Sequence, residues 1–152
     1  MQSGYHNLPS FDGVDEKDGG RFASRDEIFD EAAKSFTAEI AGAYPDEAGV
    51  ISFIRTAALT GGTVTVTYKI KLTGEKKIDM HLMSAFKPVI ECDGIHLAEG
   101  RVLTYPTDIL AVEIEEFDPV GMNTKSSWGT EKIWSIHLTA TKEEIEYTLT
   151  VK

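Results

Sequence analysis

Residues 64–72 alternate between apolar and polar side chains, and no other feature of the sequence constrains the fold as strongly. Every second position is Val, Tyr, Ile or Leu, and each position between them is Thr or Lys. Successive side chains of a β-strand point to opposite faces of the sheet, so the apolar residues share one face. The run therefore predicts a strand with one face in the core and the other in water.

The same alternation recurs at residues 110–114, 134–140 and 145–151. Turn-forming residues separate the runs: Gly61-Gly62, Gly74, Asp93-Gly94, Glu99-Gly100 and Asp118-Pro119. Asp93-Gly94 is typical of the two-residue loop of a β-hairpin, because both central positions of a type I′ turn need a positive φ. Short strands at this spacing, each with one polar face, predict an all-β fold, an antiparallel two-sheet β-sandwich.

The beginning of the chain lacks this alternation. Residues 1–34 are polar, irregular and interrupted by Gly, and between Asp12 and Glu31 eight acidic residues face three basic ones. We therefore expect an irregular N-terminal extension, residues 1–34, followed by a β-sandwich domain, residues 35–152. By propensity alone, residues 26–43 suit a helix, although a neighbouring sheet overrides such a preference.

The charge of the chain limits its partners. It has 152 residues, of which 25 are acidic and 15 basic, for a net charge of −10. This length suffices for one domain with its own core. The acidic charge argues against nucleic acid or an anionic membrane as a partner. No apolar stretch reaches the roughly 18 residues of a membrane span, and no signal peptide opens the sequence.

Cysteine and histidine offer few sites. Cys92 is the only cysteine, which excludes an intrachain disulfide and a cysteine-built zinc site, and we expect its thiol to be buried. His6 lies in a loop-like sequence beside an amide and a proline, where it suits a metal ligand or a base. The other three histidines, His81, His96 and His137, lie in predicted strands, and we expect polar-face positions for them.

The carboxylates and the tryptophans suggest two further kinds of functional site, a catalytic carboxylate pair and a sugar-binding tryptophan. Glycosidases need two carboxyl groups about 5–9 Å apart in a cleft, but neighbours on any polar strand face satisfy this distance. Glu113 and Glu115 therefore predict a solvated sheet face rather than a catalytic pair. Trp134 belongs to an alternating core face. Trp128, flanked by Ser127 and Gly129, suits either stacking against a sugar ring or closure of one end of the sandwich.

Several short strings, taken in order, resemble the heparinase II/III-like polysaccharide lyases. Gly4-Tyr5-His6-Asn7-Leu8-Pro9 and the following Asp12-Gly13-Val14 are similar to the family's H-N-x-P…(N/D)-G element. Residues 43–50, AYPDEAGV, followed by Arg55-Thr56, are similar to its A-Y-P-x-E-A-G-V stretch and R-T pair. Weaker matches follow in the same order: His81-Leu82-Met83, Asp118-Pro119, Trp128-Gly129 and residues 133–136.

The resemblance implies a role inside a larger enzyme. These lyases consist of a helical toroid and a two-sheet β region, and they cleave uronic-acid polysaccharides such as heparan sulfate or alginate by β-elimination. A base removes the proton α to the uronate carboxyl, and a tyrosine or histidine acid assists the leaving oxygen. Most catalytic residues of the family would lie upstream of Met1, so the resemblance assigns none to this chain. The upstream helical-toroid catalytic domain is the implied partner. Members are often periplasmic or secreted.

The resemblance also bears on the N-terminal part. Some members carry a structural zinc in the β region, and the histidine of the H-N element, here His6, is the implied ligand, with a His and an Asp upstream as its partners. Residues 1–34 would be a remnant of, or a linker from, an upstream β region, and Ser35–Ile40 would be a strand. No basic cluster for an anionic polymer is evident, since Lys69 and Lys71 fall on a polar strand face.

Two functions follow from these observations. The first is the C-terminal β-sandwich of a heparinase II/III-like polysaccharide lyase, with a supporting role and inactive alone. The alternative is a non-catalytic carbohydrate-binding or adhesion β-sandwich, with polysaccharide as its partner and Trp128 as its binding residue.

Overall fold

The structure is an antiparallel β-protein. The computed structural model describes residues 7–117, 129–130 and 132–152. The strands are β1 (Pro9–Phe11), β2 (Arg25–Asp30), β3 (Ser35–Glu39), β4 (Val50–Thr60), β5 (Thr63–Ser84), β6 (Val89–Glu91), β7 (Gly94–His96), β8 (Val102–Thr104), β9 (Ala111–Phe117) and β10 (Ile133–Val151). Three short 3-10 turns are η2 (Ala41–Ala43), η3 (Asp46–Ala48) and η4 (Ala98–Gly100). No helix in the described part of the chain is long and apolar enough to cross a membrane.

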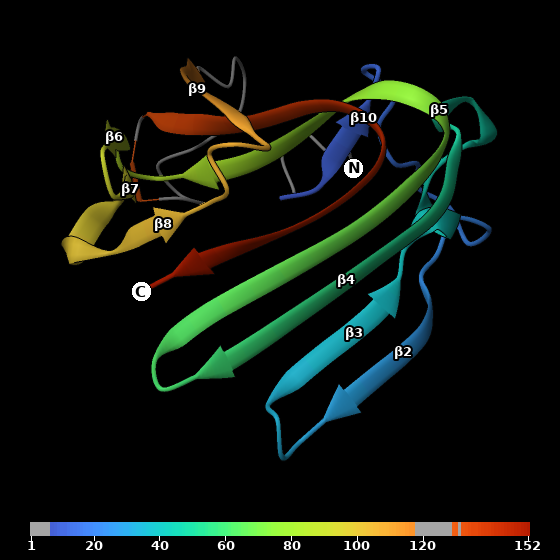
Figure 1. Ribbon diagram of the computed structural model, residues 1–152, viewed down its shortest axis with the longest axis horizontal. Coiled ribbons are helices and arrows are strands. Elements are labelled where there is room, and N and C mark those ends of the chain that lie inside the picture. The colour runs from blue at the N-terminus through green and yellow to red at the C-terminus, as the bar shows by residue number, and fades with distance from the viewer. Residues whose placement is uncertain (1–6, 118–128, 131) are drawn as a thin grey trace.

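All strands belong to one hydrogen-bonded network. The strand order is β2-β3-β4-β5-β10-β8-β7-β6, while β1 also pairs with β5 and β9 with β10. The two longest strands, β5 and β10, bend together, so one half of each lies in a lower layer with β2, β3 and β4 (Figure 1). The other halves lie in an upper layer with β1 and β9 (Figure 1). The all-β sandwich predicted from the sequence is confirmed.

The bend lies at an irregularity in the β5–β10 pairing. Lys142 pairs with Lys76, but Glu144 pairs with Lys71, so residues 72–75 of β5 lie opposite residue 143 alone. A bulge of this kind bends a strand and reverses the alternation of its side chains. In the β10 segments that flank the bend, the core residues Ile136 and Leu138 are even-numbered, and Ile145, Tyr147 and Leu149 are odd-numbered. At the start of the strand, Ile133 and Ser135 are buried as well.

The core between the layers contains a chain of aromatic rings. Phe11 of β1 contacts Tyr44 and Phe53, with ring centroids 5.0 and 6.1 Å away. Phe53 continues to Tyr68 at 6.3 Å, and Tyr68 stacks on Tyr147 at 4.9 Å. The Tyr44 hydroxyl donates a hydrogen bond to the carbonyl of Pro9 at 2.7 Å. Aromatic contacts of this kind contribute beyond the area that they bury, and here they join β1, β4, β5 and β10.

The predicted core face of residues 64–72 is only partly covered. Tyr68, Ile70 and Leu72 are buried as expected, but Val64 at the start of β5 keeps 41% of its surface exposed. This end of β5 extends with β2, β3 and β4 as an arm beyond the upper layer (Figure 1). Its apolar residues therefore continue the core face without a covering layer.

The predicted hairpin at Asp93-Gly94 forms with a different loop. Glu91 pairs with Gly94, so Cys92 and Asp93 make the loop and Gly94 already belongs to β7. Gly94 has a φ of +145°, and a Cβ atom there would lie 2.6 Å from the carbonyl oxygen of Leu103. Close approach of β8, and not the turn itself, requires glycine at this position. Cys92 at the tip is exposed, so the expectation of a buried thiol is wrong.

The N-terminal segment contributes two strands. β1 pairs with the second half of β5, and β2 pairs with β3. Strand β3 covers Ser35–Glu39, in agreement with the strand expected at Ser35–Ile40, and the helix that propensity allowed does not form. The division of the chain at residues 34 and 35 stays a prediction.

Candidate functional site

Both site residues chosen from the sequence, His6 and Trp128, lie outside the described residues. The zinc ligand and the carbohydrate-binding tryptophan therefore stay predictions. Asn7, next to His6, is the first described residue of the H-N element. Its side-chain oxygen accepts a hydrogen bond of 3.0 Å from the backbone of Met83, which holds this element against β5.

Two histidines and an aspartate meet on the outer face of the upper layer. His81 of β5 and His137 of β10 are direct partners across the strand pair, and their ring centroids lie 4.7 Å apart. Asp79 precedes His81 by two positions and therefore shares its face. Its Oδ1 lies 3.1 Å from Nδ1 of His137 and 3.8 Å from Nε2 of His81. We call these three residues the Asp79 cluster.

The Asp79 cluster is half-buried and has further polar neighbours. Ser10 of β1 places its hydroxyl 3.4 Å from Nε2 of His81. Lys77 donates to Oδ2 of Asp79 at 3.2 Å, and Glu115 lies 3.8 Å from Nε2 of His137. Burial lowers the pKa of His81, and the nearby Asp79 carboxylate only partly offsets this effect. Burial thus favours the neutral form of the His81 ring over the charged one.

Sequence reasoning placed His81 and His137 on polar faces but did not bring them together. The face is correct, since both point away from the core residues Met80 and Leu138. Their meeting depends on the register of two strands that lie far apart in the sequence. The only local signal was the Asp-x-His spacing of residues 79–81, which is too common to indicate a site.

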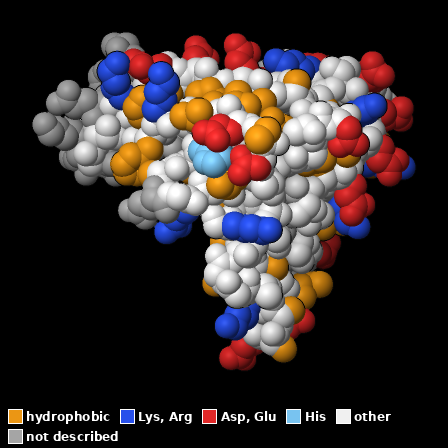
Figure 2. All heavy atoms as spheres, turned by 60° about the vertical axis from the view of Figure 1, so that its left-hand side comes forward, with side chains coloured by type: hydrophobic (Ala, Val, Ile, Leu, Met, Phe, Trp, Pro, Cys, Tyr) orange, Lys and Arg blue, Asp and Glu red, His pale blue; other side chains and the backbone are white. Residues whose placement is uncertain are grey.

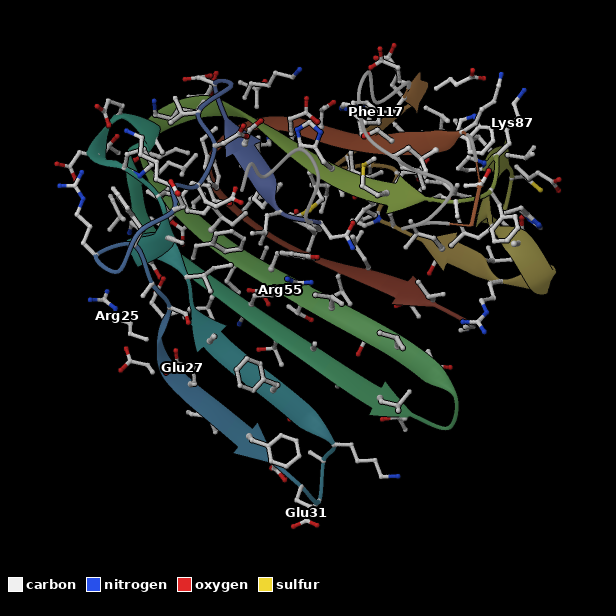
Figure 3. The ribbon with its side chains drawn as sticks, turned by 180° about the vertical axis from the view of Figure 1, so that it is seen from behind. Arg25, Glu27, Glu31, Arg55, Lys87 and Phe117 are labelled. Atoms are coloured by element: carbon white, nitrogen blue, oxygen red, sulfur yellow. The ribbon has the colours of Figure 1, made fainter. Side chains whose placement is uncertain are left out.

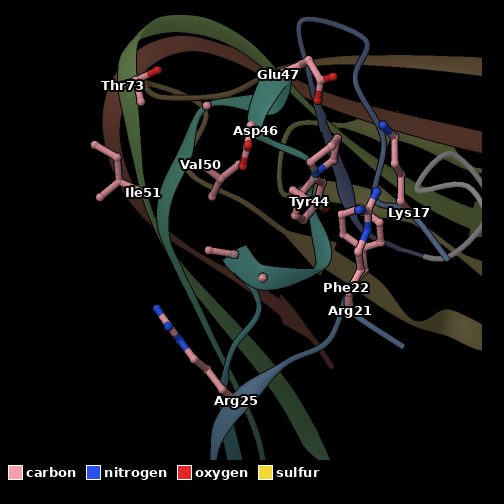
Figure 4. Close-up of a pocket in the computed structure, with 14 residues that line it drawn as sticks. Lys17, Arg21, Phe22, Arg25, Tyr44, Asp46, Glu47, Val50, Ile51 and Thr73 are labelled. Carbon is pink, nitrogen blue, oxygen red and sulfur yellow. The ribbon is translucent and has the colours of Figure 1, made fainter. Parts of the chain in front are cut away.

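Basic residues gather at a pocket on the N-terminal side of the molecule. Lys17, Arg21 and Arg25 line a cavity of about 750 Å³ together with Phe22 (Figure 4). The Arg21 guanidinium lies 4.7 Å from the centroid of the Phe22 ring. Asp46 and Glu47 also line the cavity, which leaves one excess positive charge among these residues. We call this cavity the basic pocket.

The inner face of the arm is apolar and exposed. Pairing of Phe29 with Phe36, and of Phe36 with Ala57, places these side chains on the same face as Val66 of β5. Phe29 is 70% exposed and Phe36 is 46% exposed. The arm projects from the body with hydrophobic side chains at its surface (Figure 2).

The inner face leads to Arg55 and Tyr68. The Arg55 guanidinium lies 5.6 Å from the centroid of the Tyr68 ring (Figure 3). A hollow of about 750 Å³ adjoins it, lined among others by Phe36, Ala38 and Tyr44. Nε of Arg55 is buried and finds no hydrogen-bond partner within the described residues. The arm therefore offers an apolar face with one incompletely paired cation at its base.

Comparison with known proteins identifies the fold. No family model and no curated protein matches the sequence. Among solved structures, the chain is similar to the heparan sulfate lyase HepC from Pedobacter heparinus, with a TM-score of 0.75 and 12% sequence identity. A mutant of that lyase matches equally. The match covers 99% of this chain and 24% of HepC, so the chain spans about a quarter of that protein's length. This chain has the fold of a domain-sized part of a heparan sulfate lyase.

Proposed function

We propose that this chain is the C-terminal β-sandwich of a heparinase II/III-like polysaccharide lyase, and that it supports a catalytic body and is inactive alone. The observation that carries the proposal is the fold match, which takes in nearly the whole of this chain but only a quarter of HepC. The ordered sequence strings, from the H-N element to residues 133–136, support the same family independently of the fold.

The chemistry of β-elimination supports inactivity of the isolated chain. The reaction needs an accessible base near the proton α to a uronate carboxyl and an acid near the leaving oxygen. Tyr68 and Tyr147 are buried in the core, and burial raises the pKa of both phenols. Neither can reach a polysaccharide. A base and acid on the upstream body would supply the reaction in the intact enzyme.

The inner face of the arm supports a packing role. Phe29 and Phe36 lie on the same face of the sheet as the core residues but are exposed, because no second layer covers them in the described part of this chain. An exposed apolar patch of this kind is typical of an interface with another part of the protein. Full burial of one such side chain contributes about 1.5–3 kcal/mol, so Phe29 and Phe36 together would stabilise an interface substantially. We propose that the upstream segment of the same polypeptide covers this face of the arm. It would also supply a hydrogen-bond acceptor for Arg55.

The packing role is tested by assembly in trans. The upstream segment of the lyase and the 152-residue chain are expressed separately and mixed, and the complex is measured by size-exclusion chromatography. We expect Phe29→Ser with Phe36→Ser to abolish the complex. Ile28→Ser is the matched control, because Ile28 lies in the same strand, is 63% exposed and points to the opposite face. Equal loss of the complex in both variants, or retention in both, would refute this role.

A carbohydrate-binding domain is the second candidate, and the basic pocket favours it. Guanidinium and ammonium groups beside an aromatic ring suit a uronate carboxylate with its sugar ring. Affinity electrophoresis against alginate, heparan sulfate and a neutral glycan tests it. Retardation by the uronans that Lys17→Ala with Arg21→Ala removes would establish binding at this pocket, and Trp128→Ala tests the tryptophan. Unretarded migration on every glycan would exclude this function.

A further inference from the structure

We propose that the Asp79 cluster binds a zinc ion on the outer face of the β5–β10 pair. The ligands are Oδ1 of Asp79, Nε2 of His81 and Nδ1 of His137. This inference does not depend on the proposed function, and His6 is not one of the ligands. The ion would connect the two bent strands in the upper layer, next to the place where β1 joins β5.

The spacing of the three ligand atoms suits one ion. Zinc takes nitrogen and carboxylate ligands at about 2.0–2.2 Å, so two ligands at a tetrahedral angle lie roughly 3.3–3.5 Å apart. The distances from Oδ1 of Asp79 to the two imidazole nitrogens, 3.1 and 3.8 Å, bracket this value. One ligand atom from each of the three residues lies within 4.8 Å of the other two.

Neighbouring groups supply the outer contacts that metal ligands need. A ligating histidine usually gives its second nitrogen a carboxylate or carbonyl partner, and a ligating carboxylate is itself hydrogen-bonded. Without a metal, Nδ1 of His137 donates a hydrogen bond of 3.1 Å to Oδ1 of Asp79. When Nδ1 binds zinc, the proton would move to Nε2, where Glu115 lies 3.8 Å away as the carboxylate partner. Lys77 donates a hydrogen bond to Oδ2 of Asp79, so the other carboxylate oxygen, Oδ1, is the one that faces the two imidazoles. The Ser10 hydroxyl or a water completes four-fold coordination beside His81.

The backbone makes the arrangement rigid. His81 and His137 are direct partners in a long antiparallel ladder that continues on both sides. β1 and β9 flank this ladder, and the side chains of all three ligands are less than one-fifth exposed. A site on regular strands holds its ligands more accurately than a site on loops.

A second histidine-acid group in the chain provides an internal contrast. Glu91, Asp93 and His96 also lie close together, but they belong to one exposed hairpin. There a single nitrogen, Nε2 of His96, faces both carboxylates, at 3.6 and 2.7 Å. This is an ordinary surface ion pair with one imidazole, so we expect it to bind zinc weakly at most.

Zinc titration of the 152-residue chain tests the proposal. The chain is freed of metal with a chelator and titrated with zinc by calorimetry, and cobalt(II) then serves as a visible-light probe of tetrahedral geometry. We expect one tight site per chain. Asp79→Asn and His137→Gln should each weaken its affinity at least about tenfold. His96→Gln should leave it unchanged, and so should His6→Gln, which separates this site from the zinc that the lyase resemblance implies.

A measurement on the unmodified chain covers the case in which a variant fails to fold. Zinc should shift the imidazole NMR signals of His81 and His137 together and leave that of His96 in place. Far-UV circular dichroism shows which variants are folded. The proposal is overturned if zinc leaves both imidazole signals unchanged. It is equally overturned if folded Asp79→Asn and His137→Gln keep full affinity, or if only His6→Gln or His96→Gln loses it.

Discussion

Tyr68 and Tyr147 lie opposite each other across the β5–β10 pair and stack with their ring centroids 4.9 Å apart and their planes 19° from parallel. The pair lies in the lower layer beyond the bend, where it ends the aromatic chain that starts at Phe11. Both rings are buried. The Tyr147 hydroxyl is buried as well and finds no hydrogen-bond partner among the described residues.

Removal of the Tyr147 hydroxyl should not lower the stability of the protein. A buried polar group without a partner costs about 1–3 kcal/mol, so Tyr147→Phe should leave the free energy of unfolding unchanged or raise it. Tyr147→Ala should lower it by about 3–5 kcal/mol, because it leaves a ring-sized cavity against Tyr68. Urea denaturation of the three proteins measures both effects. Destabilisation by Tyr147→Phe would mean that the hydroxyl has a partner.

Glu39 should contribute to stability in a pH-dependent way. Its carboxylate accepts hydrogen bonds from the Ser52 hydroxyl and from the backbone of Ala41 and Phe53, at 2.7–2.9 Å. Partial burial raises its pKa, but these hydrogen bonds together outweigh the burial, and the net pKa is lowered. The stabilisation is complete above the ordinary glutamate pKa of about 4.3 and is lost as the pH falls through the lowered folded-state pKa.

The test compares two glutamine variants. Glu39→Gln should lower the free energy of unfolding at pH 7 by about 1–2 kcal/mol and flatten the acid part of the stability curve. Glu31→Gln, at the exposed turn between β2 and β3, should change neither. Thermal unfolding between pH 3 and pH 7, roughly the range over which carboxylates titrate, measures the difference. Parallel curves for wild type and Glu39→Gln would show that the carboxylate carries no such contribution.

Gly94 should be the least replaceable of the hairpin glycines. A Cβ atom at this position would approach the Leu103 carbonyl oxygen to 2.6 Å, which the backbone of β8 cannot easily relieve. Gly61 in the β4–β5 turn also has a positive φ, +57°, but no atom lies within 4 Å of its Cβ position. Gly94→Ala should therefore destabilise the protein more than Gly61→Ala, whose cost from the left-handed backbone alone is about 1–2 kcal/mol. Equal melting temperatures for the two variants would contradict the packing at β8.

The sequence predicted the strands well because alternation is a local property. Tyr68, Ile70 and Leu72 are buried as expected, and so are Ile136, Leu138, Ile145, Tyr147 and Leu149 in the runs 134–140 and 145–151. Trp134, expected on the core face, is only partly buried, whereas its neighbours Ile133 and Ser135 are buried. The two runs have opposite parity, and in the structure they belong to one strand with a bulge after Lys142. Alternation alone cannot distinguish a bulge from a turn, because both reverse the side-chain pattern.

The candidate sites were harder to predict from the sequence than the strands, because they depend on which residues pair across neighbouring strands. From the sequence, Asp79, His81 and His137 are each predicted only to lie on the polar face of a strand. It is the pairing of β5 with β10 that brings them together. The basic pocket likewise depends on the course of the N-terminal segment, which has no periodicity. The family resemblance pointed to His6 and Trp128, and these lie outside the described residues.

The most direct test of the central claim is a comparison of this chain with the product of its complete genomic reading frame. Both are incubated with heparan sulfate and alginate, and the ultraviolet absorbance of the unsaturated uronate product is followed. We predict that the frame encodes a helical toroid upstream of the codon for Met1, and that only the longer product generates absorbance. Cleavage by the 152-residue chain alone, or an upstream frame without a toroid, would contradict the claim.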